Sequence, residues 1–257
     1  MKPLPVVATI KEAFLVVWQK RLALFRALIV TGLVLAALNV TQSHFLKGFG
    51  WVSLVLANVI LYWVVFTLFA ITCHRIVLLG DASVPEYGLH SWTSRETRFF
   101  GWGAVVFLYV LLIVVPVILV IVGAAFAGVP FTKGYEKYWG LLGAVPAMYV
   151  VARLAVLFPA TAIGERRSTD WAFSTTAKNG WRLVITTSLI PAALGFAISA
   201  LPVEHSLLAD FLAQLVRCAL MAIGIAALSL SFRFLSPAGP EEDEADRASQ
   251  RTAEGSH

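Results

Sequence analysis

Two arginines, Arg153 and Arg217, lie inside long apolar stretches of the sequence. With a rise of 1.5 Å per residue, Arg153 lies about 22 Å along a helix counted from Tyr138, and Arg217 about 15 Å from Leu207. An arginine at such depth in a membrane costs at least about 2.5 to 3.5 kcal/mol unless it meets a partner or a wet cavity. Because a guanidinium stays charged and donates paired hydrogen bonds to phosphate, both residues are candidates for binding an anionic group.

Asp210, Gln214 and Arg217 follow one another at i, i+4 and i+7, a spacing that places them on one face of a helix. One interpretation is structural: Arg217 pairs with Gln214, Asp210 or carbonyls freed near prolines, while Arg153 reaches the cytoplasmic headgroups. A second interpretation is that one or both arginines line a cavity for a lipid phosphate. A third, a proton or coupling-ion pathway, requires an embedded carboxylate, and Asp210 is the candidate.

A basic insert at residues 168–182 separates two apolar runs. On a single helix, one face would carry Phe173, Ala177, Trp181 and Val184, and the opposite face Thr175, Lys178, Asn179 and Arg182. The pattern predicts a helix lying on the membrane surface, its basic side chains held by anionic lipid. The alternative is a docking face for a protein partner, for which the candidate residues are Lys178, Arg182, Trp171 and Trp181.

No nucleophile motif, zinc-binding motif, phosphate-binding loop or pair of carboxylates in a plausible pocket is found, so no catalytic residue is predicted. Cys73 and Cys218 stand apart within apolar runs and are expected to be buried free thiols. His74 is interpreted as an interfacial side chain, because no second ligand follows at metal spacing. Neither a metal nor a cofactor is expected.

The elements that position these residues follow from composition. Of 257 residues, 59% are hydrophobic and 14% charged, and the mean hydropathy is +0.80. Such apolar runs predict an all-α, polytopic membrane bundle rather than a soluble domain. Six transmembrane helices are expected at about residues 22–40, 51–79, 101–129, 138–164, 183–201 and 207–235.

Fifteen of the 20 Lys and Arg residues lie in segments that are cytoplasmic if the N-terminus is inside, and three lie outside. The positive-inside rule therefore predicts that both termini are cytoplasmic. The net charge of +5 is explained by topology and anionic headgroups, so nucleic-acid binding is not expected. The first apolar helix is expected to remain as an anchor, since no cleavable signal peptide is visible. Residues 237–257 are acidic and free of aromatics, which predicts a disordered cytoplasmic tail.

Residues 9–21 contain a Thr9–Glu12 capping-box pattern and predict an interfacial helix before the first span. Segments 86–100 and 169–181 precede the third and fifth spans, as segment 9–21 precedes the first. The chain is therefore interpreted as three units, each an interfacial helix followed by a transmembrane hairpin. The simpler alternative is that any six-span protein has surface segments on its inner side.

The stretch from Leu154 to Val184, together with Arg153 before it, resembles the bacterial YciC-like family and the related membrane domain of glycerophosphodiester phosphodiesterases. Residues 74–80, HRIVLLG, show a weaker similarity to stand-alone bacterial membrane proteins. The resemblance implies a six-helix protein of the bacterial inner membrane, without an attached phosphodiesterase domain. Matching positions are Arg153, Pro159, Ala160, Gly164, Glu165, Trp171, Lys178, Gly180, Trp181 and Arg182.

From these features we expect a non-enzymatic protein of envelope or lipid homeostasis that binds anionic membrane lipid. The alternatives are a small transporter or exporter subunit, and a scaffold or assembly factor with a membrane or cytosolic protein partner. The sequence leaves the oligomeric state open.

Overall fold

The computed structural model describes residues 2–44, 52–88, 91–127, 136–199 and 206–236. Within these ranges the chain forms helices joined by turns and contains no strand. The protein is an all-α, polytopic helix bundle, as the sequence predicts. The tail predicted to be disordered, 237–257, lies outside the described residues. Six helical stretches are long and apolar enough to cross a membrane, at Arg21–His44, Val52–Leu79, Ser94–Ala124, Gly140–Ala162, Gly180–Ala197 and Leu207–Leu235.

The chain passes through ten α-helices in the described ranges, with a 3-10 turn at Asp81–Ser83 and a π-helical turn at Ile185–Leu189. These α-helices are α1 (Val6–Gln19), α2 (Arg21–His44), α3 (Val52–Leu79), α4 (Ser94–Phe126), α5 (Glu136–Leu154), α6 (Leu157–Ala162), α7 (Thr169–Thr176), α8 (Gly180–Val184), α9 (Ile190–Ser199) and α10 (Leu207–Leu235).

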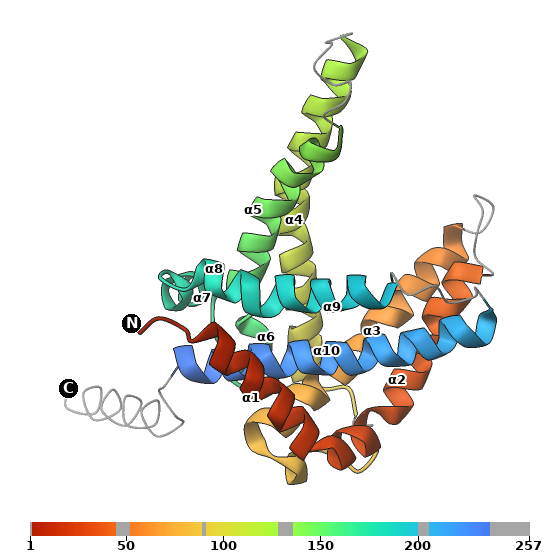
Figure 1. Ribbon diagram of the computed structural model, residues 1–257, viewed down its shortest axis with the longest axis vertical. Coiled ribbons are helices and arrows are strands. Elements are labelled where there is room, and N and C mark those ends of the chain that lie inside the picture. Colours follow the sequence, from red (N-terminus) through yellow and green to blue (C-terminus); the bar gives the residue numbers. More distant parts are fainter. Residues whose placement is uncertain (1, 45–51, 89–90, 128–135, 200–205, 237–257) are drawn as a thin grey trace, which may run out of the picture.

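Helix α10 is the centre of the bundle. It packs against α1, α2, α3, α6 and α9, which come from both ends of the sequence (Figure 1). Cys218, Ala222 and Ala226 recur every four residues along it, and all three are buried. Small side chains at this spacing let neighbouring helices approach closely, which is the usual basis of packing between membrane helices.

Helices α4 and α5 form a hairpin that projects away from the other helices (Figure 1). None of the residues in the most apolar window of α4 is buried within the molecule. Leu112 is 72% exposed and Leu119 is 65% exposed. Apolar surface of this extent is compatible with a lipid environment, where apolar side chains need no cover from protein.

The fourth predicted span, 138–164, is interrupted rather than continuous. Helix α5 ends at Leu154, and α6 begins after a turn at Ala155 and Val156. Pro159 explains the break, because proline has no N–H to offer the carbonyl of Ala155 and its ring would clash with that carbonyl. The Ala155 carbonyl accepts instead from Phe158 N at 3.1 Å.

Helix α1 begins earlier than predicted, and the Thr9–Glu12 capping box is wrong. The helix starts at Val6 with no side-chain cap, and the Thr9 hydroxyl donates to the carbonyl of Pro5. At the break between α1 and α2, Lys20 Nζ donates to the carbonyl of Ile76 at 2.7 Å. This contact satisfies a carbonyl near the C-terminal end of α3, where a positive charge is also favourable.

A true capping box occurs at the start of α4. The Thr93 N–H donates to Glu96 Oε2 at 2.8 Å, and the Arg95 N–H donates to Thr93 Oγ1. Arg95 pairs with the fully buried Glu96 at 2.7 Å. Residues 94–100 therefore belong to α4 itself, and within 86–88 and 91–100 no separate surface helix precedes the hairpin. The second of the three proposed repeat units therefore lacks the interfacial helix that was expected before its hairpin.

The insert at 168–182 is not one surface helix. Ser168 accepts a hydrogen bond from Trp171 N and begins α7, which ends at Thr176, and α8 begins at Gly180. The break places Asn179 and Thr175 in the interior, although they were predicted to lie on the polar outer face, and leaves Ala177 exposed. The single amphipathic stripe predicted for this segment is therefore wrong.

Candidate functional site

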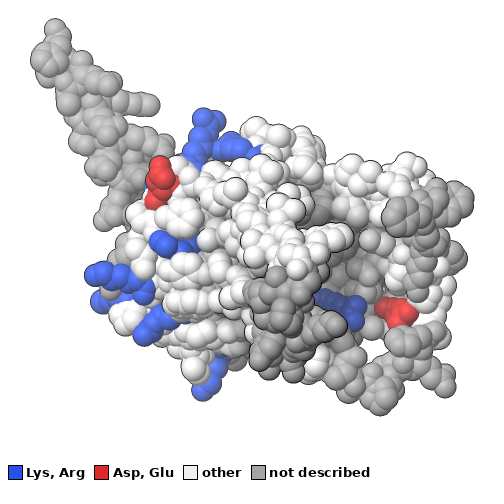
Figure 2. Space-filling model, turned by 90° about the horizontal axis from the view of Figure 1, so that it is seen from above, with Lys and Arg blue, Asp and Glu red and all other residues white. Residues whose placement is uncertain are grey.

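Three of the four predicted site residues line one polar hollow between α2 and α10. Asp210, Gln214 and Arg217 contribute from α10, as their helical spacing predicts, and the hollow has a volume of about 540 Å³. Figure 2 shows a basic and an acidic group in a hollow at the end of the molecule opposite its main group of basic side chains. Its lining from α2 consists of Asn39, Ser43 and His44.

The hollow is crossed by two hydrogen bonds between its walls. His44 Nε2 lies 2.6 Å from Asp210 Oδ2, and Gln214 Nε2 donates to Asn39 Oδ1 at 2.8 Å. The side chains of His44 and Asp210 are 27% and 31% exposed, so neither member of the pair is fully buried. These contacts fix the positions of both walls before any ligand arrives.

The charges of the hollow are mixed. Arg217 supplies a permanent positive charge, and Asp210 supplies a carboxylate that is paired with His44. The Asn39 side-chain nitrogen carries N–H donors of its own beside them. The arrangement offers hydrogen-bond donors for a phosphate and, at Asp210, an acceptor for an amine.

Arg153 lies away from this hollow, at the C-terminal end of α5. Its Nε donates to Thr176 Oγ1 at 2.9 Å, and its Nη2 donates to the carbonyl of Phe173. The guanidinium also stacks on two rings, 4.8 Å from the Phe173 centroid and 5.6 Å from that of Tyr149. Arg153 thus holds α7 against α5. The structure does not bring it together with Arg217.

Sequence reasoning did not predict a role for Asn179, which holds the N-terminal segment. Asn179 Oδ1 accepts from Leu4 N at 2.7 Å, and its side-chain nitrogen donates to the carbonyl of Lys2. Arg182 donates to the carbonyl of Leu4 at 2.8 Å. Leu4 itself is fully buried. The backbone before α1 is therefore attached to the break between α7 and α8.

The four residues of the predicted partner face have different surroundings. Lys178 is exposed, and Trp181 is 57% exposed while its ring lies 5.0 Å from that of Tyr149. Trp171 is half-buried between Arg167 and Phe232. Arg182 is engaged with the N-terminal segment. Figure 2 shows basic side chains gathered toward the end of the molecule where α7 and α8 lie.

His74 is not an interfacial side chain, as the sequence suggested, but is 1% exposed. It lies in the last turns of α3, with its ring 6.1 Å from that of Phe99. The apolar run continues beyond it to Leu79, and α4, α6 and α10 cover that end of α3. Cys73 and Cys218 are buried and free, as predicted.

The residues that sequence reasoning missed in the hollow are Asn39, Ser43 and His44. The first span was expected to end at Val40, so Ser43 and His44 were assigned to a loop. In the structure α2 continues to His44. A helical extension of the apolar pattern would have placed Asn39 and Ser43 on one face, four residues apart, but not against α10.

Comparison with protein-family models, curated proteins and solved structures finds no match to this chain. The fold and the hollow define the class: a multi-pass helical membrane protein with a polar hollow between its first and last apolar helices. The resemblance to the YciC-like family stays a prediction.

Proposed function

We propose that the protein is a non-enzymatic inner-membrane protein of lipid or envelope homeostasis, which binds a phospholipid headgroup in the hollow between α2 and α10. The observation that carries the proposal is the position of Arg217, about 15 Å along α10 from Leu207, among other polar side chains. An arginine at this depth is stabilised by a polar cavity, and a lipid headgroup is the most abundant anionic group beside it.

The chemistry of the walls suits a phosphate. An arginine presents several N–H donors in a rigid plane, so it can keep one contact within the protein and still donate to a phosphate. Asn39 donates from the opposite wall, and the hydrogen bond between Gln214 and Asn39 holds that amide in place. Asp210 then lies on the same helix face, where an amine-bearing headgroup would meet it.

The transporter alternative requires a polar cavity in the middle of the bundle. In the described part of the chain, the cavity between α3, α4, α6 and α10 is lined mainly by apolar side chains. This lining favours a lipid-binding role over passage of a charged solute. The scaffold alternative depends on Lys178 and Trp181, which are exposed, because Arg182, although also exposed, donates to the carbonyl of Leu4.

The orientation is part of the proposal. The positive-inside rule puts α1, α7 and α8 on the cytoplasmic side, in a bacterial inner membrane. The ends of α2 and α10 that form the hollow then face the opposite side. The lipid bound there would come from the outer leaflet of that membrane.

The test is lipid retention by the full-length protein purified in mild detergent and analysed by native mass spectrometry. Arg217→Ala is expected to lose the bound phospholipid that the unaltered protein keeps, because the phosphate loses its charged donor. Asn39→Ala is expected to weaken retention less. Arg166→Ala is the matched control, since it removes one exposed positive charge elsewhere. Equal retention by the Arg217 and Arg166 variants, with helical content unchanged, would rule out the hollow as the binding site.

A further inference from the structure

A second cavity lies where α3, α4, α6, α10 and the π-helical turn converge, and it contains no residue of the hollow described above. Its volume is about 280 Å³, close to the lower limit of about 300 Å³ for small-molecule pockets. Among the described residues, none with a charged side chain lines it. Its aromatic lining consists of Trp63, Phe66, Phe99, Phe100 and Phe158.

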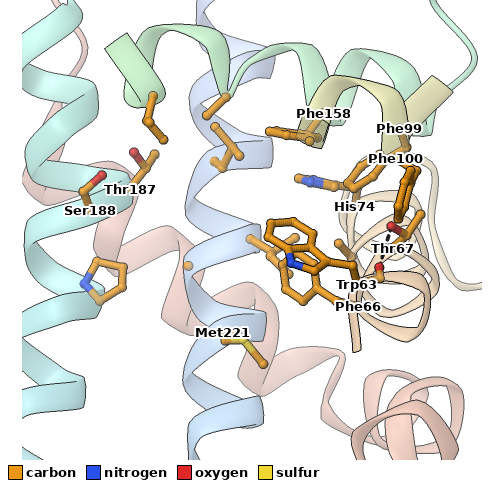
Figure 3. Close-up of a pocket in the computed structure, with 18 residues that line it drawn as sticks. Trp63, Phe66, Thr67, His74, Phe99, Phe100, Phe158, Thr187, Ser188 and Met221 are labelled. Atoms are coloured by element: carbon orange, nitrogen blue, oxygen red, sulfur yellow. Dashed lines mark hydrogen bonds between the residues drawn. The ribbon is translucent and has the colours of Figure 1, made fainter. Parts of the chain in front are cut away.

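His74 points into this cavity. Figure 3 shows its imidazole between Phe158 and the Trp63–Phe66 pair, with a nitrogen directed toward the middle of the pocket. The side chain is 1% exposed, so its surroundings are the cavity wall rather than water. Among the described residues, its Nδ1 has Ser229 as partner, whereas its Nε2 has no hydrogen-bond partner.

The hydrogen bonds around Ser229 decide which tautomer His74 adopts. Ser229 Oγ donates its single hydrogen to the carbonyl of Ile225 at 2.9 Å, one helical turn back. With that hydrogen on Ile225, the hydroxyl oxygen is assigned as the acceptor from His74 Nδ1–H, 2.7 Å away. In a neutral imidazole with hydrogen on Nδ1, Nε2 is a hydrogen-bond acceptor. Nε2 is therefore an acceptor that faces the cavity and that no described residue supplies with a hydrogen.

The opposite wall is formed by the π-helical turn, Ile185–Leu189, which contributes Thr187 and Ser188 (Figure 3). Pro191 follows this turn and cannot donate to the carbonyl of Thr187, so the helix widens before it. Such single π-helical turns are frequent at functional sites. Thr187 donates its hydroxyl to Leu183, whereas Ser188 is available as a second polar contact.

We propose that this cavity binds an uncharged membrane-soluble molecule with an apolar body and a hydroxyl group that donates a hydrogen bond to His74 Nε2. The absence of a charged side chain in the lining disfavours an ionised ligand, which would be costly to bury there. The aromatic lining accommodates either a ring or a chain. Two sources share this chemistry, a long-chain lipid alcohol and an alkylated quinol, and both reach the cavity from the bilayer.

The hydroxyl should determine affinity. A ligand that leaves Nε2 unpaired forfeits a hydrogen bond to an acceptor on the cavity wall, which corresponds to roughly a tenfold or greater loss of affinity. The first measurement therefore needs no variant. Dodecan-1-ol is compared with its methyl ether, which keeps the chain and the oxygen but has no O–H to donate. Binding to the purified full-length protein in nanodiscs is followed by thermal stabilisation and by the ¹⁵N resonance of His74 Nε2.

The alcohol is expected to bind about tenfold more tightly than the ether and to shift the Nε2 resonance. That resonance is identified by its absence from the spectrum of His74→Gln. His74→Phe should abolish the preference for the alcohol. Gly103→Leu provides a second variant that keeps His74, because a side chain at Gly103 enters the cavity beside Trp63, whose ring lies 3.6 Å from an added Cβ. Gly103→Leu should bind neither dodecan-1-ol nor its ether. Ser53→Leu, at an exposed site on α3, is the control and should bind dodecan-1-ol as the unaltered protein does.

Mass spectrometry of the organic extract of the purified protein separates the two sources. Recovery of a lipid alcohol or of a quinol supports the proposal and identifies the ligand. Equal affinity for dodecan-1-ol and its ether overturns it, as does binding that Gly103→Leu leaves unchanged. No residue of the α2–α10 hollow is altered here, so failure of this proposal and failure of headgroup binding are distinguishable.

Discussion

The side chain of Arg153 joins α5 to α7, two helices that α6 separates in the chain. Its guanidinium donates to Thr176 and to the carbonyl of Phe173 and lies over the rings of Phe173 and Tyr149. Hydrogen bonds from a charged group contribute about 1.5 to 3 kcal/mol each. A residue first considered for ligand binding is thereby engaged in holding α7 against α5.

Replacing Arg153 should therefore destabilise the fold without emptying the lipid site. Arg153→Ala is expected to lower the free energy of unfolding by about 3 kcal/mol, the lower end of what two such hydrogen bonds contribute. Arg153→Lys should be intermediate, because an ammonium cannot reproduce the planar pair of contacts. Unfolding in detergent measures the effect, with exposed Lys178→Ala as the control. Stability equal to that of the control would show that these contacts contribute little, and loss of lipid from a folded Arg153→Ala protein would reassign the residue to binding.

At the scale of the helices, the Tyr149 ring of α5 packs directly on Gly180 at the start of α8. A Cβ added at Gly180 would lie 2.6 Å from Tyr149 Cε2. Gly180→Ala is expected to cost about 1 to 3 kcal/mol through overpacking. Gly195→Ala is the matched control, because an added Cβ there meets nothing within 4 Å and alanine favours a helix.

A double-mutant cycle identifies the cause of the effect. With Tyr149→Ala in the background, Gly180→Ala should cost markedly less, since the atoms that it meets are gone. Thermal unfolding of the single and double variants provides the comparison. Additive losses would mean that contact with the Tyr149 ring is not the cause of the cost at residue 180.

The helices also show how far the sequence could predict this molecule. Long apolar runs identify the spans, because a bilayer demands about 20 apolar residues per helix. Helical spacing alone places Asp210, Gln214 and Arg217 on one face. It cannot place Asn39 and His44 opposite them, since the register of α2 against α10 depends on packing between residues distant in sequence. Asn179 appeared to lie on a solvent face because the pattern assumed a helix that in fact breaks before it.

Across the whole molecule, apolar side chains are buried by protein in one part and exposed in another. The helices α1, α2, α3 and α10 share one buried core, whereas the α4–α5 hairpin projects with its apolar side chains exposed (Figure 1). A water-soluble protein rarely exposes an apolar surface of this kind. The hairpin therefore depends on the bilayer, rather than on the rest of the chain, to cover it.

This dependence predicts the effect of a charge at the middle of α4. Leu112 lies near the centre of the helix and is 72% exposed, so Leu112→Arg would face lipid. An arginine at the centre of a span costs about 2.5 to 3.5 kcal/mol on insertion scales. Insertion of the hairpin, measured by accessibility of a cysteine placed at residue 133, should fall in Leu112→Arg and remain normal in Leu112→Phe. If Leu112→Arg inserted normally but altered the size of the purified particle, the exposed face of α4 would be covered by protein rather than by lipid.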